Sequence, residues 1–357
     1  MKDKVLTIDA RMLFAGGIGT YLQNLLKRIR FETLGLRVEI YVRTDAQAAW
    51  MRQYQPDATI KRCPHWIYGI EEQLFWLKNL KGGLFWAPHF NIPWRGYERL
   101  VVTVHDCFPL TPIAHPLMRL YGGVMFGRIK RAANAIITVS DFSKNEMAVR
   151  AKISPNRVNV IYSGVAPVWF TRAEGSPPYD FPYLVYIGNL KVHKNLRRLL
   201  QAFEKLQTNH KLVVVGPKKE LKMRDDAALN LMGHLRERVV PVERATDEEL
   251  LRLVKHARGL VLPSLYEGFG LPPLEAMAAG VPTLVGNAAS MPEICGPAAL
   301  YCDPTSVEDI QEGIEKLIHL QGEERERRIE KGYEHAAQFN WDKTVTQTLE
   351  VFRRTLS

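Results

Sequence analysis

The sequence predicts an α/β protein built from two doubly wound parallel sheets, and three observations indicate this fold class. Short β-branched runs alternate with amphipathic helical patterns along the whole chain. The runs are continuously apolar, as expected for strands that helices cover on both faces. The length of 357 residues suits two domains, and a stretch rich in Gly and Pro, residues 164–182, separates two similar halves.

Each half is expected to contain six strands. In the first half we expect them at residues 5–9, 38–42, 84–87, 100–104, 135–139 and 159–162. In the second half we expect them at residues 183–187, 211–215, 239–242, 259–262, 281–285 and 299–302. The expected domains are residues 1–168 and 180–338, with a last helix at 341–357. Because doubly wound folds bind ligands at the carboxyl ends of their strands, we expect the functional residues just after these strands, in a cleft between the halves.

The composition is that of a globular protein, with 46% hydrophobic and 24% charged residues, which excludes disordered and fibrous classes. The formal net charge of +10 suits an anionic substrate, an anionic membrane surface or nucleic acid, and solubility alone would also explain it. We find no apolar run of the length of a signal peptide or a membrane span. The four cysteines lack metal-ligand spacing, so we expect small buried side chains in a cytoplasmic protein.

Two segments of the first half place polar groups just after a strand. In the first, Gly16, Gly17 and Gly19 open a helix whose N–H groups favour an anion, and a tight turn is the alternative. Their spacing differs from that of dinucleotide-binding loops, which argues against a dehydrogenase. In the second, His105 can bind a substrate or transfer a proton, unless it is only a hydrogen-bonded histidine at a strand end. Asp106 would then orient the imidazole.

A basic segment, residues 188–195, leads into a helix expected at 195–206 in the second half. A lysine beside a helix N-terminus, here Lys194, suits a pyrophosphate. An exposed basic loop is the alternative.

The most specific pattern surrounds Glu267 and Glu275, which stand eight residues apart around a glycine turn and a proline that opens a helix. We expect Glu267 in the loop and Glu275 in the first helical turn. Each carboxylate can accept two hydroxyl hydrogens, as recognition of a vicinal diol requires, and the N–H groups of residues 269–271 suit a phosphate. A helix-dipole role explains one glutamate but not the pair. No Asp-x-Asp pattern occurs, so no metal ion held by carboxylates is expected.

These motifs together resemble the retaining, GT-B-fold glycosyltransferases of family 4, and the resemblance covers nearly the whole chain. The spacing of Glu267 and Glu275 is similar to the E-x7-E motif of that family. Further similar segments are the glycine loop at residues 16–21, the His-Asp segment at 102–106, a Val-Ser-x-x-Ser segment at 139–143, and residues 186–189 with 194–195.

The resemblance implies that the second half binds a nucleotide-sugar donor while the first half binds the acceptor, with the last helix crossing back onto the first half. It implies that Glu275 holds the ribose, that Glu267 holds the donor sugar, and that Lys194 neutralises the diphosphate. The implied catalytic residues are His105, Glu267 and Lys194. The implied donor-binding residues are Gly17, Asn189, Lys194, Glu267, Gly268, Phe269, Gly270, Leu271 and Glu275. No cofactor and no metal ion are implied.

One position departs from the family pattern. Many members carry an arginine where this chain has Asn189, so Lys194 must act with another cation, such as Lys191, Lys218 or Arg244, or hold the diphosphate less tightly. A subset resembling mannosyltransferases of surface-polysaccharide synthesis has asparagine there, and residues 72–93 also resemble that subset. The donor expected on this basis is GDP-mannose. A UDP- or dTDP-sugar, a sugar epimerase of the same fold, and a basic binding protein on a Rossmann pair are the alternatives.

The acceptor is expected to be a glycan or a lipid-linked saccharide. Aromatic residues crowd the segment 66–97, and basic residues cluster at 27–37 and 128–131. Aromatic side chains stack on sugars or lie at bilayer surfaces, and basic clusters attract the anionic cytoplasmic leaflet. Peripheral attachment to the inner face of the membrane is therefore a further expectation, and nucleic acid is the least expected partner.

Overall fold

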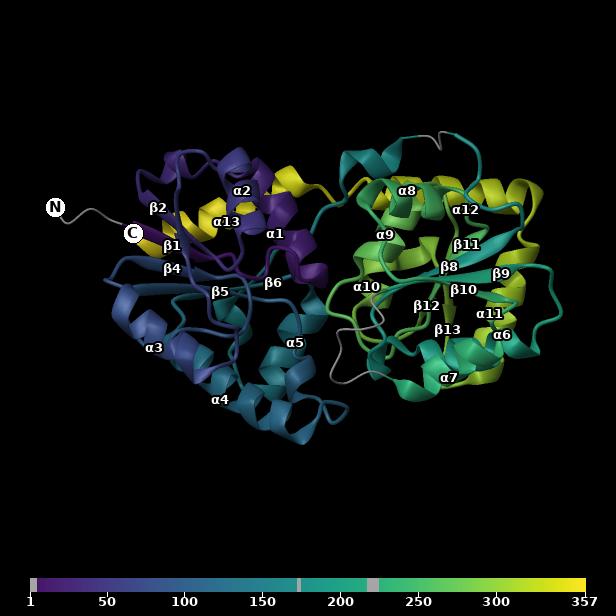
Figure 1. Cartoon of the computed structure of the whole chain (residues 1–357), viewed down its shortest axis with the longest axis horizontal. Helices are drawn as coiled ribbons and strands as arrows, with labels where there is room; N and C mark the ends of the chain where they lie inside the picture. The colour runs from purple at the N-terminus through teal and green to yellow at the C-terminus, as the bar shows by residue number, and fades with distance from the viewer. Residues whose placement is uncertain (1–4, 172–174, 217–224) are drawn as a thin grey trace. The chain divides into compact units, whose positions relative to one another are not determined.

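The computed structural model describes residues 5–171, 175–216 and 225–357. The chain divides into two compact units (Figure 1). The first unit comprises Met1–Gly164 with Asn340–Ser357, and the second comprises Val165–Phe339.

The sheet of the first unit has seven strands in the order β3-β2-β1-β4-β5-β6-β7, and all its pairs are parallel. The six expected strands are present, and β3 was missed. It consists of Thr59–Arg62, a short edge strand whose residues are exposed or half-buried, so it lacks the apolar run that marks the others. The strands are β1 Val5–Asp9, β2 Arg37–Val42, β3, β4 Leu84–Ala87, β5 Arg99–Val104, β6 Ala135–Thr138 and β7 Val158–Val160.

The sheet of the second unit has six parallel strands in the order β10-β9-β8-β11-β12-β13, and all six were expected. They are β8 Tyr183–Ile187, β9 Lys211–Val215, β10 Val239–Val242, β11 Gly259–Leu262, β12 Thr283–Gly286 and β13 Leu300–Cys302. The chain leaves β8 toward β9 on one side and later returns to form β11 on the other. The edge between β8 and β11 is therefore the switch point where such folds bind ligands.

Helices cover the sheets in both units. The first unit contains α1 Gly16–Arg28, α2 Asp45–Tyr54, α3 Ile70–Asn79, α4 Pro116–Ala132, α5 Asp141–Arg150 and α13 Trp341–Leu356. The second unit contains α6 Leu196–Lys205, α7 Asp226–His234, α8 Asp247–Lys255, α9 Leu271–Ala278, α10 Met291–Cys295, α11 Val307–His319 and α12 Gly322–Ala336.

The last helix, α13, packs against the first unit, as the family resemblance implied. Its Phe352 is fully buried and contacts the Trp86 ring of β4 at 5.3 Å. The helix also contacts α1 and β5. Burying one large aromatic side chain contributes about 2 kcal/mol, so the end of the chain helps to hold the first unit together.

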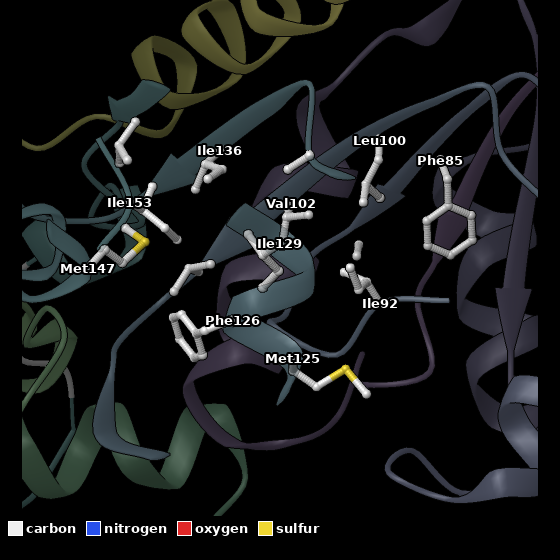
Figure 2. Close-up of a cluster of buried hydrophobic side chains, with 14 of the residues drawn as sticks. Phe85, Ile92, Leu100, Val102, Met125, Phe126, Ile129, Ile136, Met147 and Ile153 are labelled. Carbon is white, nitrogen blue, oxygen red and sulfur yellow. The ribbon is translucent and has the colours of Figure 1, made fainter. Parts of the chain in front are cut away.

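A buried apolar cluster lies between the first unit's sheet and its helices, and Figure 2 shows part of it. Strands β4 and β5 contribute Phe85, Leu100 and Val102, and α4 contributes Phe126 and Ile129. The four cysteines are buried, as expected. Among the described residues, no helix is long and apolar enough to cross a bilayer.

Candidate functional site

Two of the predicted site residues meet at the switch point of the second unit. Lys194 follows β8 and Glu267 follows β11, and these two strands are parallel neighbours. Their loops therefore emerge at the same edge of the sheet. The Lys194 Nζ lies 2.6 Å from Glu267 Oε1 and 2.7 Å from Oε2. The structure thus joins as one ion pair two residues that lie 73 positions apart in the sequence.

The ion pair leaves limited hydrogen-bonding capacity for a ligand. Glu267 also accepts a hydrogen bond of 2.8 Å from Ser264 Oγ. A carboxylate offers about four acceptor positions, so about one remains on Glu267. An ammonium has three N–H donors, two of which point to Glu267. The side chains are 19% and 12% exposed, so a ligand can still reach the ion pair.

Buried polar side chains that the sequence analysis did not select fix the two loops. Ser290 Oγ lies 2.9 and 2.7 Å from the carbonyl oxygens of Glu267 and Phe269, which share its one O–H donor. Asn195 Nδ2 donates to the carbonyls of Pro263 and Pro304, at 2.8 and 2.6 Å. Because Ser290 and Asn195 are buried, these bonds hold the loop that carries Glu267 in one conformation. The only sequence signals were the position of Asn195 in the Lys-Asn motif and of Ser290 at a helix start.

The turn that precedes α9 requires glycine. Gly270 has a φ of 126°, and a Cβ there would lie 2.5 Å from Cε of Met291. Two prolines follow at 272 and 273, which have no N–H group. The N–H donors at the start of α9 therefore come from residues up to Leu271, the stretch that the sequence analysis selected for a phosphate.

Glu275 has surroundings unlike those of Glu267. It is the fifth residue of α9, so the expectation that it lies in the first helical turn was wrong. Withdrawal of its carboxyl from water raises its pKa to about 7, although a hydrogen bond from the Trp169 side chain lowers it and the negative charge of Asp247 raises it further. Near neutral pH, Glu275 is therefore divided between its acid and its carboxylate.

Positive charge gathers in the loop before α6. Burial lowers the pKa of His193 to about 3, and the positive charges of Lys194 and Lys191 lower it further. Asn189 accepts a hydrogen bond of 3.4 Å from the Lys191 N–H, so its side chain shapes this loop. Of the other cations considered, Arg244 is exposed and Lys218 lies outside the described residues.

The glycines at the start of α1, in the first unit, separate into two kinds. A Cβ on Gly19 would lie 2.7 Å from the carbonyl oxygen of Leu13, so packing requires glycine there. A Cβ on Gly17 would meet no atom within 4 Å, so packing of the chain does not explain glycine there. No side chain caps this helix, and its first turn has no acidic residue. The N–H groups beside Gly17 thus form a helix N-terminus that suits an anion.

His105 follows β5 and is uncharged near neutral pH. Its Nε2 lies 3.0 Å from the carbonyl oxygen of Pro88, which can only accept, so Nε2 carries the proton. Burial lowers the pKa of His105 to about 4. Its ring contacts Tyr21 of α1 edge-on at 4.9 Å. The Pro88 carbonyl thus helps to orient the imidazole. Asp106 accepts the Phe108 N–H at 2.8 Å, and its expected role in orienting His105 stays a prediction.

A buried charged network at the carboxyl end of the first unit's sheet was missed by the sequence analysis. Arg11 forms ion pairs with Asp9 at 2.6 Å and with Glu72. His89 Nε2 lies 3.1 Å from Asp9, and Asn91 Nδ2 donates to Glu72 at 2.8 Å. Burial alone would raise the pKa of Asp9, but the charge and hydrogen bonds of Arg11 and His89 hold it well below its usual range. The network fixes the loop after β4, whose Pro88 orients His105.

The described residues contain no cluster of three or more His, Cys, Asp or Glu side chains that could hold a metal ion. The second unit offers a ligand N–H donors, one lysine and two carboxylates, and the first unit offers N–H donors and an imidazole. Such groups suit a ligand that carries both hydroxyl groups and phosphate.

Family comparisons cover almost all of the chain. Residues 168–335 match the family described as Glycosyl transferases group 1. Residues 15–169 match the family described as Glycosyltransferase Family 4. The two matches meet close to the boundary between the structural units.

Comparison with individual proteins gives the same result. The O-antigen chain mannosyltransferase B of Escherichia coli is 33% identical over 301 residues, which cover 79% of this chain and 77% of that protein. The serotype-specific mannosyltransferase WbdA of Escherichia coli is 28% identical over 287 residues, 75% of this chain and 34% of that protein. The structure of Anabaena HepE in complex with UDP and glucose superposes with a TM-score of 0.76 at 17% identity, covering 98% of this chain and 99% of that one, which shows a common fold.

Proposed function

This chain is a glycosyltransferase of family 4, and from that premise we propose that it transfers mannose from GDP-mannose to a saccharide acceptor in the synthesis of a surface polysaccharide. The observation that carries the proposal is the Lys194–Glu267 ion pair at the switch point, which offers one N–H and one acceptor position to a donor. Its similarity to mannosyltransferases favours mannose, and a UDP- or dTDP-sugar is the alternative donor.

In this proposal the diphosphate binds to Lys194 and to the N-terminus of α9. Departure of the diphosphate leaves an oxocarbenium-like sugar and concentrates negative charge on the leaving oxygen. The third N–H of Lys194 and the N–H groups of residues 269–271 stabilise that charge. The family resemblance implies that the N-terminus of α1, at Gly17, also binds the diphosphate. These donors act without a metal ion.

The two glutamates recognise different hydroxyl groups. Glu275, as a carboxylate, accepts two hydrogen bonds from the vicinal hydroxyls of the ribose. Glu267 has about one acceptor position left and takes one hydroxyl of the mannose. Lys194 and Glu267 are paired directly, so one rigid pair holds both the sugar and the diphosphate. This fixes the position of the bond between them, which is the bond that breaks.

His105 binds rather than protonates in this mechanism. Its proton lies on Nε2 and is donated to Pro88, so Nδ1 offers a lone pair to a sugar hydroxyl. Transfer with retention then takes place on one face of the sugar. The bond from the anomeric carbon to the diphosphate oxygen breaks and the bond to the acceptor oxygen forms. The acceptor's proton passes to the departing diphosphate oxygen.

A donor panel tests the proposal. The purified chain is incubated with GDP-, UDP- and dTDP-sugars and an acceptor extract, with and without EDTA, and nucleoside diphosphate release is measured. We expect release from GDP-mannose that EDTA leaves unchanged, and an α or β linkage in the product that matches the donor. Release from no donor would refute the transfer, and inversion at the anomeric carbon would refute the mechanism.

Two variants test the residue roles. Glu275→Ala should weaken donor binding, and Glu267→Ala should mainly lower kcat. Glu326→Ala is the control, because Glu326 is exposed on α12 of the second unit. Kinetics equal to those of the control in both site variants would overturn the assignment.

A further inference from the structure

One helix of the first unit presents apolar side chains to the solvent. Ile113, just before α4, and Leu117, Leu120 and Val124 on the helix are all exposed, the two leucines by 71% and 70%. Spacings of three and four residues place Leu117, Leu120 and Val124 along one stripe of the helix. The solvent-facing side of a helix in a globular protein normally carries polar residues.

The opposite face of α4 already fills the core of the unit. Met125, Phe126 and Ile129 are buried, and Figure 2 shows them within the apolar cluster. The helix is therefore apolar on two sides, and the core explains only one of them. An extended apolar stripe of this kind marks an interaction surface.

The charges of α4 identify the partner. The helix has four basic residues, Arg119, Arg128, Lys130 and Arg131, and no acidic residue. Arg128 binds the carbonyls of Pro93 and Trp94, while Arg119, Lys130 and Arg131 are exposed. Apolar side chains flanked by exposed cations, with no anions between them, match an anionic lipid surface. A second copy of the same face would bring like charges together, which opposes a symmetric dimer.

A hollow of about 420 Å³ lies beside the stripe, at the start of α4. It is lined by Leu110, Pro116, Arg119, Leu120 and Arg150. Arg150 forms an ion pair with Glu146, so Arg119 is the guanidinium that suits a phosphate attached to a lipid chain.

The surface extends from α4 to α3 through Trp94. The Trp94 N–H donates to Gln73 of α3 at 2.9 Å, and its carbonyl accepts from Arg128 of α4 at 2.8 Å. Trp94 is partly exposed, and so are Leu74 and Leu77 of α3. Tryptophan favours the interface between lipid and water, so its place between two exposed apolar helices fits the same partner.

We propose that the outer face of α4, with Trp94 and the exposed residues of α3, docks the protein onto an anionic lipid bilayer. The stripe inserts among the acyl chains near the headgroups, and the exposed cations bind lipid phosphates. Docking does not depend on the donor. Resting on the proposed function, it also makes the acceptor a lipid-linked saccharide, because an enzyme docked on a bilayer meets acceptors that are anchored in the same bilayer.

Sedimentation with vesicles tests the docking. The full chain is mixed with vesicles of phosphatidylcholine alone, or with one quarter phosphatidylglycerol, at about 0.1 M salt. We expect binding to the anionic vesicles, at least tenfold weaker binding to the neutral ones, and release at high salt. Equal binding to both vesicles, or to neither, would overturn the proposal.

Variants separate the surface from general charge. Leu117→Ser with Leu120→Ser, and Arg119→Glu with Arg131→Glu, should each weaken vesicle binding at least tenfold. The matched control is Arg327→Glu with Lys331→Glu, which changes the net charge equally on exposed positions of α12. A control that loses binding to the same extent would contradict the proposal.

Further measurements test whether the leucine variant is folded and whether the face binds a second copy of the chain. The circular dichroism spectrum and Tm of the leucine variant should equal those of the wild type, which shows that the variant is folded. Its nucleotide binding should also be unchanged, which separates a failure of docking from a failure of the proposed function. Analytical ultracentrifugation should show monomers for both. A wild-type dimer that the leucine variant abolishes would assign the face to a second copy instead.

Discussion

Replacing Glu275 with glutamine should abolish a pH dependence of donor binding that is unusual for a carboxylate. Burial raises the pKa of Glu275 to about 7, and its proposed role requires the ionised form, which accepts two hydroxyl hydrogens. As the pH falls through 7, the carboxyl becomes protonated and loses acceptor capacity. Donor affinity should therefore fall in the same range.

The size of the effect follows from that pKa. With a pKa of about 7, roughly nine tenths of Glu275 is ionised at pH 8 and roughly one tenth at pH 6. If only the ionised form binds, Kd should rise about tenfold between pH 8 and pH 6, or about 1.4 kcal/mol. At pH 7, binding should release about half a proton.

Calorimetric titration with GDP-mannose at pH 6, 7 and 8 measures the dependence, because its diphosphate does not titrate in that range. Repeating the pH 7 titration in buffers of different ionisation enthalpy gives the proton count. Glu275→Gln should bind more weakly at pH 8, with a Kd that does not change with pH. A constant Kd for the wild type, or an equal slope for the variant, would refute the role of Glu275.

The raised pKa of Glu275 also makes the stability of the folded chain depend on pH. In the unfolded chain this carboxyl has the ordinary glutamate pKa of 4.5, so the folded state binds more protons between pH 4.5 and 7. Stability contributed by the protonated form is therefore lost as the pH rises through 7. Relative to wild type, Glu275→Gln should gain stability between pH 5 and pH 8, measured by urea unfolding, and a relative loss would contradict the burial argument.

Three further predictions concern the other site residues. Gly17→Ala should lower kcat at least tenfold while its Tm stays equal to or above that of the wild type. Gly19→Ala should lose about 1–3 kcal/mol of stability, because its Cβ meets a backbone oxygen. A wild-type kcat for Gly17→Ala would show that the N–H groups beside Gly17 have no role in catalysis. Lys194→Met should slow single-turnover transfer about 10²–10³-fold, and transfer at the wild-type rate would exclude Lys194 from the diphosphate site. The pH–rate profile should lack a limb near 6.5 from His105, whose pKa is lowered to about 4, so a limb there that His105→Gln removes would contradict its neutral role.

The strands could be predicted because burial on both faces of a parallel sheet selects apolar, β-branched runs. β3 was not predicted, because it lacks this burial. Its residues, Thr59–Arg62, lie at the sheet edge and are exposed or half-buried, so the sequence there has no apolar run to detect. Its place in the sheet depends on pairing with β2, which is a tertiary contact.

The candidate residues could be selected from the sequence, but the contacts between them could not be predicted. Lys194 and Glu267 were both selected, yet as separate ligands of diphosphate and sugar. Only the neighbouring positions of β8 and β11 reveal that they form one ion pair. The different surroundings of Glu275 likewise depend on Trp169, which comes from a distant turn.

Charged residues in the core are the hardest case for sequence reasoning. Arg11 and Glu72 look like ordinary surface residues, because lone charges are almost never buried. Their ion pair, 61 residues apart, makes the burial possible. The one usable signal was Asp9, a carboxylate at the end of a strand that otherwise has no charged residue.

The ion pair of Lys194 and Glu267 also bears on how one site can both bind a donor and release a diphosphate. A free lysine would attract the donor, the transition state and the product alike, and such uniform binding does not accelerate the chemical step. Paired with Glu267, Lys194 is part of a neutral unit whose one remaining N–H has a fixed direction. Its attraction for the diphosphate is reduced, but the N–H needs no reorganisation when charge develops on the leaving oxygen. Glu267→Gln, which removes the pairing charge but keeps the shape, should therefore bind nucleoside diphosphate more tightly and turn over more slowly. Equal or weaker product binding by this variant would refute the idea that Glu267 reduces the attraction of Lys194 for the diphosphate.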